Sequence, residues 1–356
     1  MLAREGDFIQ HTSNVIFDVK GLIHPKNKII AFPRYIPNPK GPRYNKKLNY
    51  NKIYNINDRF KFLQEHLPHL IIHDEIFGET MCEVPTNEII KHFQPQEKIL
   101  NLRTNKPKNI LEKKALQFAT DIQQTTNIPW TAIGISGSIL ADLTTKTSDI
   151  DLIIYGEENS YKTYTALQQM FKENHPSCRA YTKEELDVLY DFRSKDTHMS
   201  IKAFQKTEKR KAFQGMYQNT DYFIRFIKDW HENHEQYGDI YYNNVGYAKI
   251  TAKINNKINA LFTPCTYQIE NVNIIKGPNL TPITEISSFR GRFCEQAENN
   301  ETIIAQGKIE QVTNKKSNKK HYRLILGSTP EDYMILKTTN AKPSKPDHNN
   351  ENNTLR

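Results

Sequence analysis

The sequence has few cysteines and no long apolar run. Its four cysteines, Cys82, Cys178, Cys265 and Cys294, lie far apart and form no Cys-x-x-Cys pair. This spacing argues against a zinc ribbon or a disulfide framework, so four reduced thiols are expected. No apolar stretch is long enough to cross a bilayer, and residues 1–10 lack the apolar segment of a signal peptide. We therefore expect a cytoplasmic protein with no membrane partner.

Acidic residues are missing from one long stretch of the chain. None lies between Asp18 and Asp58, and this stretch holds nine Lys and Arg residues. The formal net charge of all 356 residues is +9, so the rest of the sequence is neutral in sum. A positive charge concentrated in one segment favours a polyanionic partner, usually nucleic acid.

The first hundred residues mix strand and helix patterns, and we expect a mixed α/β domain over 1–100. Strands are predicted at 15–19 and 28–32, a Pro- and Gly-rich loop at 33–47, helices at 57–67 and 85–93, and a basic linker at 101–108. The chain is long enough to form two or three domains, so further domains should follow this linker.

Residues 109–235 have the pattern of an α/β domain. Asn109 with Glu112, and Thr182 with Glu185, resemble capping boxes, so a helix is expected to begin at each pair. Strands are predicted at 131–136, 149–155 and 222–227, a short helix at 139–143 and a longer one at 160–174, with 197–204 as a further candidate strand.

Residues 240–337 are expected to be all-β. Strands are predicted near 248–254, 265–269, 285–294, 302–312 and 321–326, separated by polar turns. Five or six short strands are typical of a small barrel or a sandwich. The polar tail, residues 338–356, is expected to be disordered.

The segment at 132–156 contains the residues that point to chemistry. A strand pattern leads into Gly137-Ser138, and ten residues later Asp149-x-Asp151 opens a second strand. Glycine lets the backbone pass close to a phosphate, and the Ser138 hydroxyl with the amides of the following turn can hold a triphosphate. Residues two apart on a strand share a face, so the two carboxylates suit divalent ions about 3.5–4 Å apart. Hard oxygen ligands favour Mg²⁺ or Mn²⁺.

The pattern Gly-Ser, ten residues, Asp-x-Asp resembles the signature of the DNA polymerase beta-like nucleotidyltransferase superfamily. The resemblance implies an α+β protein whose palm-like α/β core transfers a nucleoside monophosphate from an NTP. Much of the remaining chain is similar to archaeal predicted nucleotidyltransferases of unknown substrate. This likeness lies in the stretches 4–9, 17–25, 30–37, 260–267, 289–297 and 330–336. We expect the core to be flanked by the N-terminal mixed domain and a C-terminal small β-barrel-like domain.

The resemblance also implies a third acid from a neighbouring strand. Asp221 is the favoured candidate, and Asp196 or Asp229 can equally be a helix cap or a surface acid. Lys146 is the candidate for binding the nucleotide phosphates together with Gly137 and Ser138, and Arg225 is a second one. For both basic residues a surface or packing role competes with phosphate binding.

The loop predicted at 33–47 alternates cations with aromatic rings. Phosphates can meet the cations and bases can stack on the rings, as in single-stranded nucleic-acid binding. The predicted nucleic-acid-binding residues are Arg34, Tyr35, Lys40, Arg43, Lys46 and Lys47. A solvated basic loop is the alternative. Arg290 and Arg292, placed on one face of a predicted strand, could add to such a surface, although solvated strand arginines are the commoner case. Isolated surface histidines are expected at His66, His69, His73, His231 and His234.

Three functions follow from these patterns. The first is an enzyme that transfers NMP from an NTP to a hydroxyl acceptor, in most cases RNA or DNA, with two divalent metal ions and release of pyrophosphate. The second is a non-catalytic nucleic-acid-binding protein with a degenerate nucleotidyltransferase fold, because no third acid stands out. The third is an antitoxin-like or scaffold module. The sequence does not predict the oligomeric state.

Overall fold

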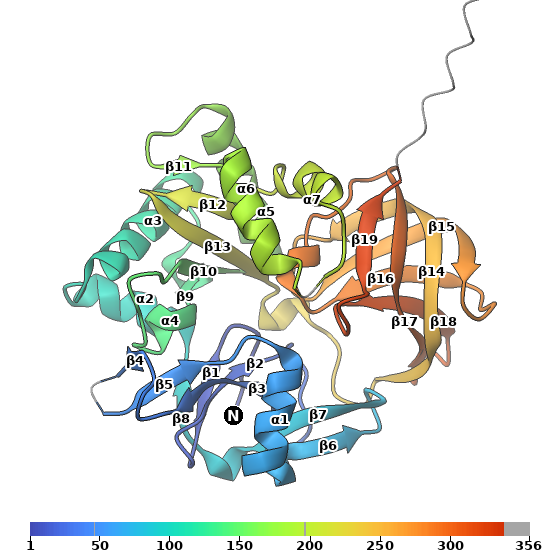
Figure 1. The fold of residues 1–356 in the computed structure, drawn as a ribbon, viewed down its shortest axis with the longest axis horizontal. Coiled ribbons are helices and arrows are strands. Elements are labelled where there is room, and N and C mark those ends of the chain that lie inside the picture. Colours follow the sequence, from blue (N-terminus) through green and yellow to red (C-terminus); the bar gives the residue numbers. More distant parts are fainter. Residues whose placement is uncertain (46, 196, 338–356) are drawn as a thin grey trace, which may run out of the picture.

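The computed structural model describes residues 1–45, 47–195 and 197–337, whose strands form three sheets (Figure 1). We call them the N-terminal sheet (β1–β8), the central sheet (β9–β13) and the C-terminal sheet (β14–β19). Within the described ranges, no helix combines the length and the apolar character needed to cross a membrane. The predicted disordered tail lies outside these ranges.

The N-terminal sheet has eight strands, with β4-β5-β3-β2-β1-β8 as its main order and β7 joining β3 to β6. Its strands are β1 (Phe8–His11), β2 (Ile16–Val19), β3 (Lys28–Pro37), β4 (Arg43–Tyr44), β5 (Asn49–Lys52), β6 (Ile71–Asp74), β7 (Glu79–Pro85) and β8 (Ile89–Phe93). Helix α1 (Ile56–His66) packs on this sheet and begins at Asn55, whose side chain accepts from the amide of Asn57. The predicted helix at 57–67 is therefore confirmed.

Three predictions for this region are wrong. The predicted loop at 33–47 contains the second half of β3 and all of β4, because Pro33 falls at a register shift opposite β2, where the ladder tolerates its missing N–H. The predicted helix at 85–93 is mostly strand β8, whose pairing with β1 overrides its local propensity. The predicted linker begins inside helix α2 (Pro95–Thr104).

The central sheet has the order β11-β12-β13-β10-β9, and β13 runs parallel to β10. Its strands are β9 (Ile133–Ile135), β10 (Ile150–Tyr155), β11 (Cys178–Arg179), β12 (Gln214–Tyr217) and β13 (Thr220–Ile227). Helices α3 (Ile110–Thr126) and α5 (Glu157–Lys172) contact each other and β10. They therefore cover one face of the sheet and leave the other face to the N-terminal sheet.

The two predicted helix starts in this region are confirmed. Asn109 accepts from the amide of Glu112 at the start of α3, and Thr182 forms a full capping box with Glu185 at the start of α6 (Lys183–Arg193). The candidate strand at 197–204 is wrong: Ser200 caps helix α7 (Ile201–Glu208), whose Phe204 is buried against Tyr190 of α6.

The C-terminal sheet consists of six strands, as the all-β pattern predicted. They are β14 (Ile240–Asn259), β15 (Cys265–Lys276), β16 (Ile283–Ser288), β17 (Thr302–Asn314), β18 (Lys320–Leu326) and β19 (Tyr333–Leu336). Strand β14 pairs with both β15 and β17, so the sheet curls back on itself. The strand predicted to reach residue 294 ends at Ser288. Arg292 lies in the 3-10 turn Gly291–Phe293 and Arg290 directly precedes it, so they do not share a strand face.

The N-terminal sheet contacts both other sheets. Beside the central sheet, buried Phe8 and Tyr35 pack with Leu140 and Leu143, which lie just after the Gly-Ser motif. Beside the C-terminal sheet, the hairpin β6–β7 docks on β14, where the Tyr242 amide donates to the Ile76 carbonyl at 2.8 Å. Figure 1 shows the hairpin extending from the blue part of the chain toward this sheet. The predicted domain boundaries stay a prediction.

Candidate active site

Gly137 stands at the end of β9, where the chain turns into the short helix α4 (Gly137–Leu140). Its φ of +61° lies in the region that favours glycine. A Cβ atom at this position would stand 1.8 Å from Oδ2 of Asp151. Glycine is therefore required here for two reasons, the backbone turn and the close approach of the Asp151 carboxylate.

Ser138 lies at the start of the same turn and is only 1% exposed. Its hydroxyl oxygen has no hydrogen-bond partner among the described residues. A buried hydroxyl without a partner is uncommon, because its desolvation costs about 1–3 kcal/mol when no bond replaces water. The Ser138 hydroxyl is thus available for a ligand that the chain itself does not supply.

Asp149 and Asp151 lie at the start of β10, on the sheet face that the helices leave uncovered. The alternating Ile150, Leu152 and Ile154 are packed in the core with α3 and α5. Asp149 and Asp151 are both partly buried, and neither forms an ion pair within the described part of the chain. Burial and the nearby Asp149 raise the pKa of Asp151 to about 7. The two carboxylates therefore repel each other where little water screens them.

Asp221 is at the start of β13, beside the carboxylate pair. Strands β10 and β13 are parallel, and Ile150 pairs with Tyr222. Asp149 and Asp221, each one residue earlier, are therefore neighbours across the two strands. The Asp221 side chain is exposed and accepts a 3.0 Å hydrogen bond from the Tyr181 hydroxyl. Among the described residues, one group of three possible metal ligands has its ligand atoms within 4.8 Å of one another, and it consists of His11, His69 and Glu88. The carboxylate oxygens of Asp149, Asp151 and Asp221 do not lie that close together.

The other two candidate acids differ in position. Asp229 is bound by Arg4, with 3.1 Å between carboxylate and guanidinium, and caps a 3-10 turn, so it is held away from the carboxylate pair. Asp196 lies outside the described residues. Of the two candidates that the structure describes, Asp221 is therefore the one that the fold brings next to Asp149.

Lys52 and Arg34 of the N-terminal sheet lie near these carboxylates, and their positive charges partly offset the rise in the pKa of Asp151. Tyr35 pairs with Lys52 across β3 and β5, so both side chains lie on the sheet face that packs on the central region. Burial and the nearby Arg34 lower the pKa of Lys52 to about 8, while Asp149 and Asp151 raise it. The basic segment identified from composition thus contributes cations to the site.

Arg225 links the N-terminal sheet to the face that carries Asp151. It lies on β13 two residues beyond Phe223, the register partner of Asp151, and forms an ion pair with Glu5. Glu5 is fully buried and also accepts from the Gly21 amide at 2.8 Å. Burial would lower the pKa of Arg225, but Glu5, Asp18 and Asp151 raise it, so the guanidinium stays charged.

The remaining predicted site residues are dispersed. Lys146 is exposed in the turn before Asp149, and Lys40 and Lys47 are exposed around β4. Tyr35 and Arg43 are buried: Tyr35 has no exposed ring surface, and Arg43 donates to the Leu143 carbonyl at 2.6 Å. Lys46 lies outside the described residues. Nucleic-acid binding by this segment stays a prediction, and the exposed side chains are the ones positioned for it.

Sequence patterns did not single out three groups that the fold brings to this face: Lys52, Arg59 and Glu5. Lys52 belongs to the acid-free segment, so its composition was a signal, but Arg59 falls just after the segment and Glu5 has no periodicity to mark it. Their proximity arises from pairing between distant parts of the chain.

His11, His69 and Glu88 form a second cluster, on the N-terminal sheet, so His69 is not the isolated residue predicted. The Nε2 atoms of His11 and His69 lie 2.6 and 3.1 Å from one Glu88 oxygen. The Ser13 amide donates to Nδ1 of His11, so the ring proton sits on Nε2 and points to Glu88. These hydrogen bonds satisfy the cluster without an ion.

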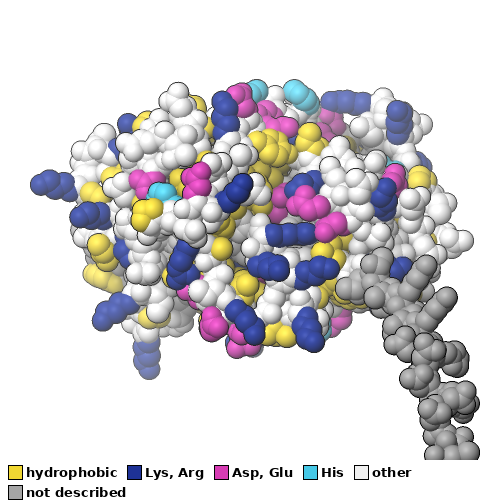
Figure 2. Space-filling view, turned by 90° about the horizontal axis from the view of Figure 1, so that it is seen from above, with side chains coloured by type: hydrophobic (Ala, Val, Ile, Leu, Met, Phe, Trp, Pro, Cys, Tyr) yellow, Lys and Arg dark blue, Asp and Glu magenta, His cyan; other side chains and the backbone are white. Residues whose placement is uncertain are grey.

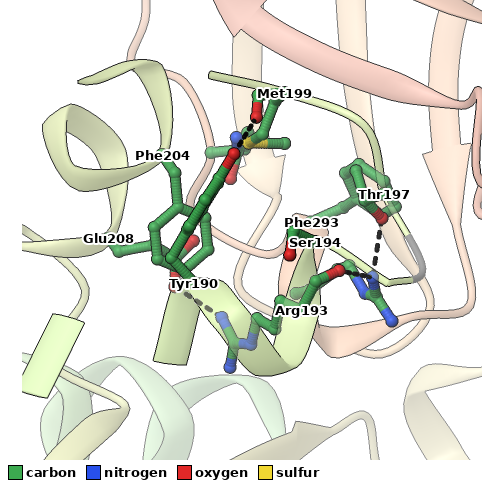
Figure 3. A pocket seen from close by; sticks show the side chains of 10 residues that line it. Tyr190, Arg193, Ser194, Thr197, Met199, Phe204, Glu208 and Phe293 are labelled. Carbon is green, nitrogen blue, oxygen red and sulfur yellow. Dashed lines mark hydrogen bonds and ion pairs between the residues drawn. The ribbon is translucent and has the colours of Figure 1, made fainter. Parts of the chain in front are cut away.

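A small pocket lies between α6, α7 and the turn before β17 (Figure 3). Figure 3 shows Arg193 directed toward Glu208, and the two side chains are hydrogen-bonded at 2.5 Å. The Arg292 guanidinium donates to the Thr197 hydroxyl at 2.6 Å. Buried Lys211 binds the other Glu208 oxygen. The charged groups of this pocket are already paired with one another. We therefore interpret it as a packing contact between the central and C-terminal regions, not as a ligand site.

Comparison with known proteins agrees with this geometry. The family model described as a nucleotidyltransferase domain matches residues 117–223, which include Gly137, Ser138, Asp149, Asp151 and Asp221. An uncharacterised protein of the archaeon Methanocaldococcus jannaschii is 33% identical over 352 residues, covering 95% of this chain and 100% of the relative. No solved structure matches the chain significantly. The chain therefore belongs to the family of this archaeal protein and carries a nucleotidyltransferase domain.

Proposed function

We propose that the protein transfers a nucleoside monophosphate from an NTP to a hydroxyl group of an acceptor, with nucleic acid as the favoured acceptor class. The observation that carries this proposal is the pair Asp149 and Asp151, two partly buried carboxylates on one sheet face without an ion-pair partner among the described residues. Such a pair is stabilised by divalent cations, which remove its repulsion. The nucleotidyltransferase domain supports the class of reaction.

The residues present fit a divalent metal and a phosphate. Carboxylate oxygens are the ligands that Mg²⁺ and Mn²⁺ prefer, and Asp149 and Asp151 offer them from one strand end. The unpartnered Ser138 hydroxyl, only 1% exposed, lies one residue after the glycine that touches Asp151. Bound metal would polarise the α-phosphate and neutralise charge on the phosphates.

In the proposed reaction, Ser138 donates a hydrogen bond to a phosphate oxygen of the NTP and helps to fix its position. Asp221 accepts the proton of the acceptor hydroxyl, and Tyr181 orients that carboxylate through its 3.0 Å hydrogen bond. The acceptor oxygen forms a bond to the α-phosphorus. The bond from that phosphorus to the bridging oxygen breaks, and pyrophosphate leaves with the electron pair.

A second function is favoured by one specific observation. The oxygens of the three acids do not lie together within 4.8 Å, and Asp221 is already bound by Tyr181. An arrangement of this kind also suits a non-catalytic nucleic-acid-binding protein that keeps the fold. The exposed Lys40 and Lys47 would then make phosphate contacts.

The two functions are separated by an assay with labelled NTPs, Mg²⁺ or Mn²⁺, and RNA, DNA and protein acceptors. We expect a labelled product with the wild-type chain and a loss of about 1,000-fold or more in Asp149→Asn and Asp151→Asn. Asp58→Asn, an exposed acid of α1, is the matched control and should retain activity. Salt-dependent nucleic-acid binding that survives both substitutions, with no product from any acceptor, would support the second function instead.

A further inference from the structure

We propose that Arg34, Lys52 and Arg59 of the N-terminal region form a binding site for a phosphate group of the substrate, opposite Asp149 and Asp151. The proposal rests on the proposed function, because it assigns a second phosphate position to the same site. It makes the N-terminal sheet a part of the active site, whereas the nucleotidyltransferase family match begins only at residue 117.

These three cations have no carboxylate partner among the described residues, in contrast to their neighbours. Lys20 lies 2.8 Å from Asp18, and Lys28 lies 2.7 Å from Glu83. Arg34, Lys52 and Arg59 form no such ion pair in the described part of the chain. The Arg34 side chain donates to the Ile53 carbonyl at 3.2 Å, and the Arg59 side chain reaches the same carbonyl at 3.5 Å.

Of the three cations, Arg59 is the one with a buried hydrogen-bond donor that has no partner among the described residues. It is 7% exposed, and its Nε atom is buried with no hydrogen-bond partner among the described residues. A guanidinium carries five N–H donors in a planar fork that matches phosphate geometry. Removing such a group from water without a partner is costly, and an anion offsets that cost.

The cations also repel one another. Burial, followed by the positive charge of Arg34, lowers the pKa of both Lys52, to about 8, and Arg59, to about 10. Arg290, from the turn that follows β16, adds to the repulsion at Arg59. Like charges gathered in a partly desolvated place destabilise the chain, and a bound anion would relieve this repulsion.

The nearby acids are already engaged. Burial raises the pKa of Asp18, but the Lys20 ammonium at 2.8 Å, and after it Arg225, Arg34 and Arg59, hold that pKa well below the usual range. The direct ion pair of Asp18 is with Lys20. Glu5 is bound to Lys20 and Arg225. Neither acid therefore supplies the missing partner of Arg59.

An exposed aromatic side chain marks the solvent edge of this group. Tyr54 is 50% exposed, and both the Arg34 guanidinium, at 5.2 Å, and the Lys52 ammonium, at 4.9 Å, lie over its ring. Its ring meets that of Phe192, from α6, at a centroid distance of 6.0 Å. The cations therefore lie at the junction between the N-terminal and central regions, where a substrate can arrive from solvent.

Pyrophosphate titrated into the full chain by calorimetry at low salt tests the site directly. We expect binding by the wild type and at least a 10-fold weaker Kd for Arg59→Met and for Lys52→Met, because each removes a charge-assisted hydrogen bond. Lys26→Met removes an exposed cation of the same basic segment and should bind as the wild type. Wild-type affinity in both site variants, or no pyrophosphate binding at all, overturns the proposal.

Two further measurements keep the outcome interpretable. Arg59→Lys and Arg34→Lys retain the charge but lose the fork, so partial recovery of binding excludes misfolding as the cause. In the transfer assay, a raised KM for NTP in Lys52→Met assigns the phosphate to the nucleotide, and a raised KM for the acceptor assigns it to the acceptor. A third outcome is that the variants lose pyrophosphate binding while the wild type shows no transfer. This outcome would support the phosphate site and contradict the proposed reaction.

Discussion

The N-terminal sheet and the central sheet meet with opposite unpaired charges. On the N-terminal side, Arg34, Lys52 and Arg59 have no carboxylate partner among the described residues, and on the central side Asp149 and Asp151 have no cation paired with them there. Each set alone is a cost to folding. The chain thus keeps the two sets apart instead of pairing them, as the proposed site for metal ions and phosphates requires.

The charge elsewhere on the molecule behaves differently. Figure 2 shows one face, seen from above, on which Lys and Arg side chains are interspersed with Asp and Glu. Exposed pairs such as Lys162 with Glu158, at 2.6 Å, are of the kind that contributes little to stability. Unpaired charge of opposite sign is thus a property of the junction between the two sheets.

Among substitutions that leave both carboxylates in place, Gly137→Ala should have the largest effect. Its new Cβ would stand 1.8 Å from Oδ2 of Asp151, so the carboxylate must move, and φ of +61° adds backbone strain. We expect transfer activity to fall by about 100-fold or more, because a displacement near 1 Å is enough for such a loss. Gly238→Ala is the matched control: φ is +92°, with nothing within 4 Å of its Cβ, so strain acts there without a clash. Equal activity losses in the two variants would contradict the clash.

Glu5→Gln tests the joint between the sheets. Glu5 is fully buried, and its replacement leaves Arg225 without its carboxylate. We expect a loss of about 2 kcal/mol in the free energy of unfolding, below the 3–5 kcal/mol of a fully buried pair because the Arg225 side chain keeps 26% exposure. Denaturant unfolding measures it. Glu158→Gln removes an exposed partner and should change stability by less than about 0.5 kcal/mol.

The pH dependence of stability tests the N-terminal sheet alone. Burial lowers the pKa of His24 to about 4 in the folded chain, whereas an unfolded histidine titrates near 6.5. Between these values the unfolded chain binds more protons, so stability falls as the pH decreases from about 6.5 to about 4. We expect this group to contribute on the order of 1–2 kcal/mol, since His24 is partly exposed.

Unfolding curves at several pH values should show this decrease in the wild type and in His73→Gln, which alters an exposed histidine. In His24→Gln the decrease should be smaller. An unchanged pH profile in His24→Gln would mean that other groups cause the decrease.

Ser138→Ala should have the smallest effect on stability, and its effects on stability and on activity should differ in direction. The hydroxyl has no partner among the described residues, so its removal should leave stability unchanged or slightly higher. Activity should fall about 10-fold if this group binds a substrate phosphate. Thermal unfolding and transfer assays on one preparation separate the two effects. A clear loss of stability would show that the hydroxyl serves the fold, not a ligand.

The sequence predicted the parts of the molecule that short-range rules control. The capping boxes at Thr182 and Asn109 need only neighbouring residues, and the spacing of Gly137, Ser138, Asp149 and Asp151 describes one β-turn-β unit. Alternation in β10 also placed both acids on one face. These features were available because they depend on a few residues at fixed separations.

The rest depends on contacts between distant residues. Residues 89–93 form a strand because β1 supplies a partner, and Tyr35 is buried because β3 packs on the loop after Ser138. The basic segment predicted a surface, yet folding divides it into exposed Lys40 and Lys47 and a partly buried set around Lys52. Composition shows how much charge a segment has, whereas tertiary pairing decides which way each side chain points.

The docking of the hairpin β6–β7 on the C-terminal sheet has a mechanical consequence. Phe77 stacks on Tyr242 with a centroid distance of 5.8 Å, and Glu79 forms an ion pair with Lys308 of β17. The hairpin joins the strands that carry Arg34 and Lys52 through β3. Any hinge motion that draws these cations away from Asp149 must therefore slide or release this distant contact. The C-terminal sheet thus acts as a restraint on how far the N-terminal sheet can move away from the candidate site.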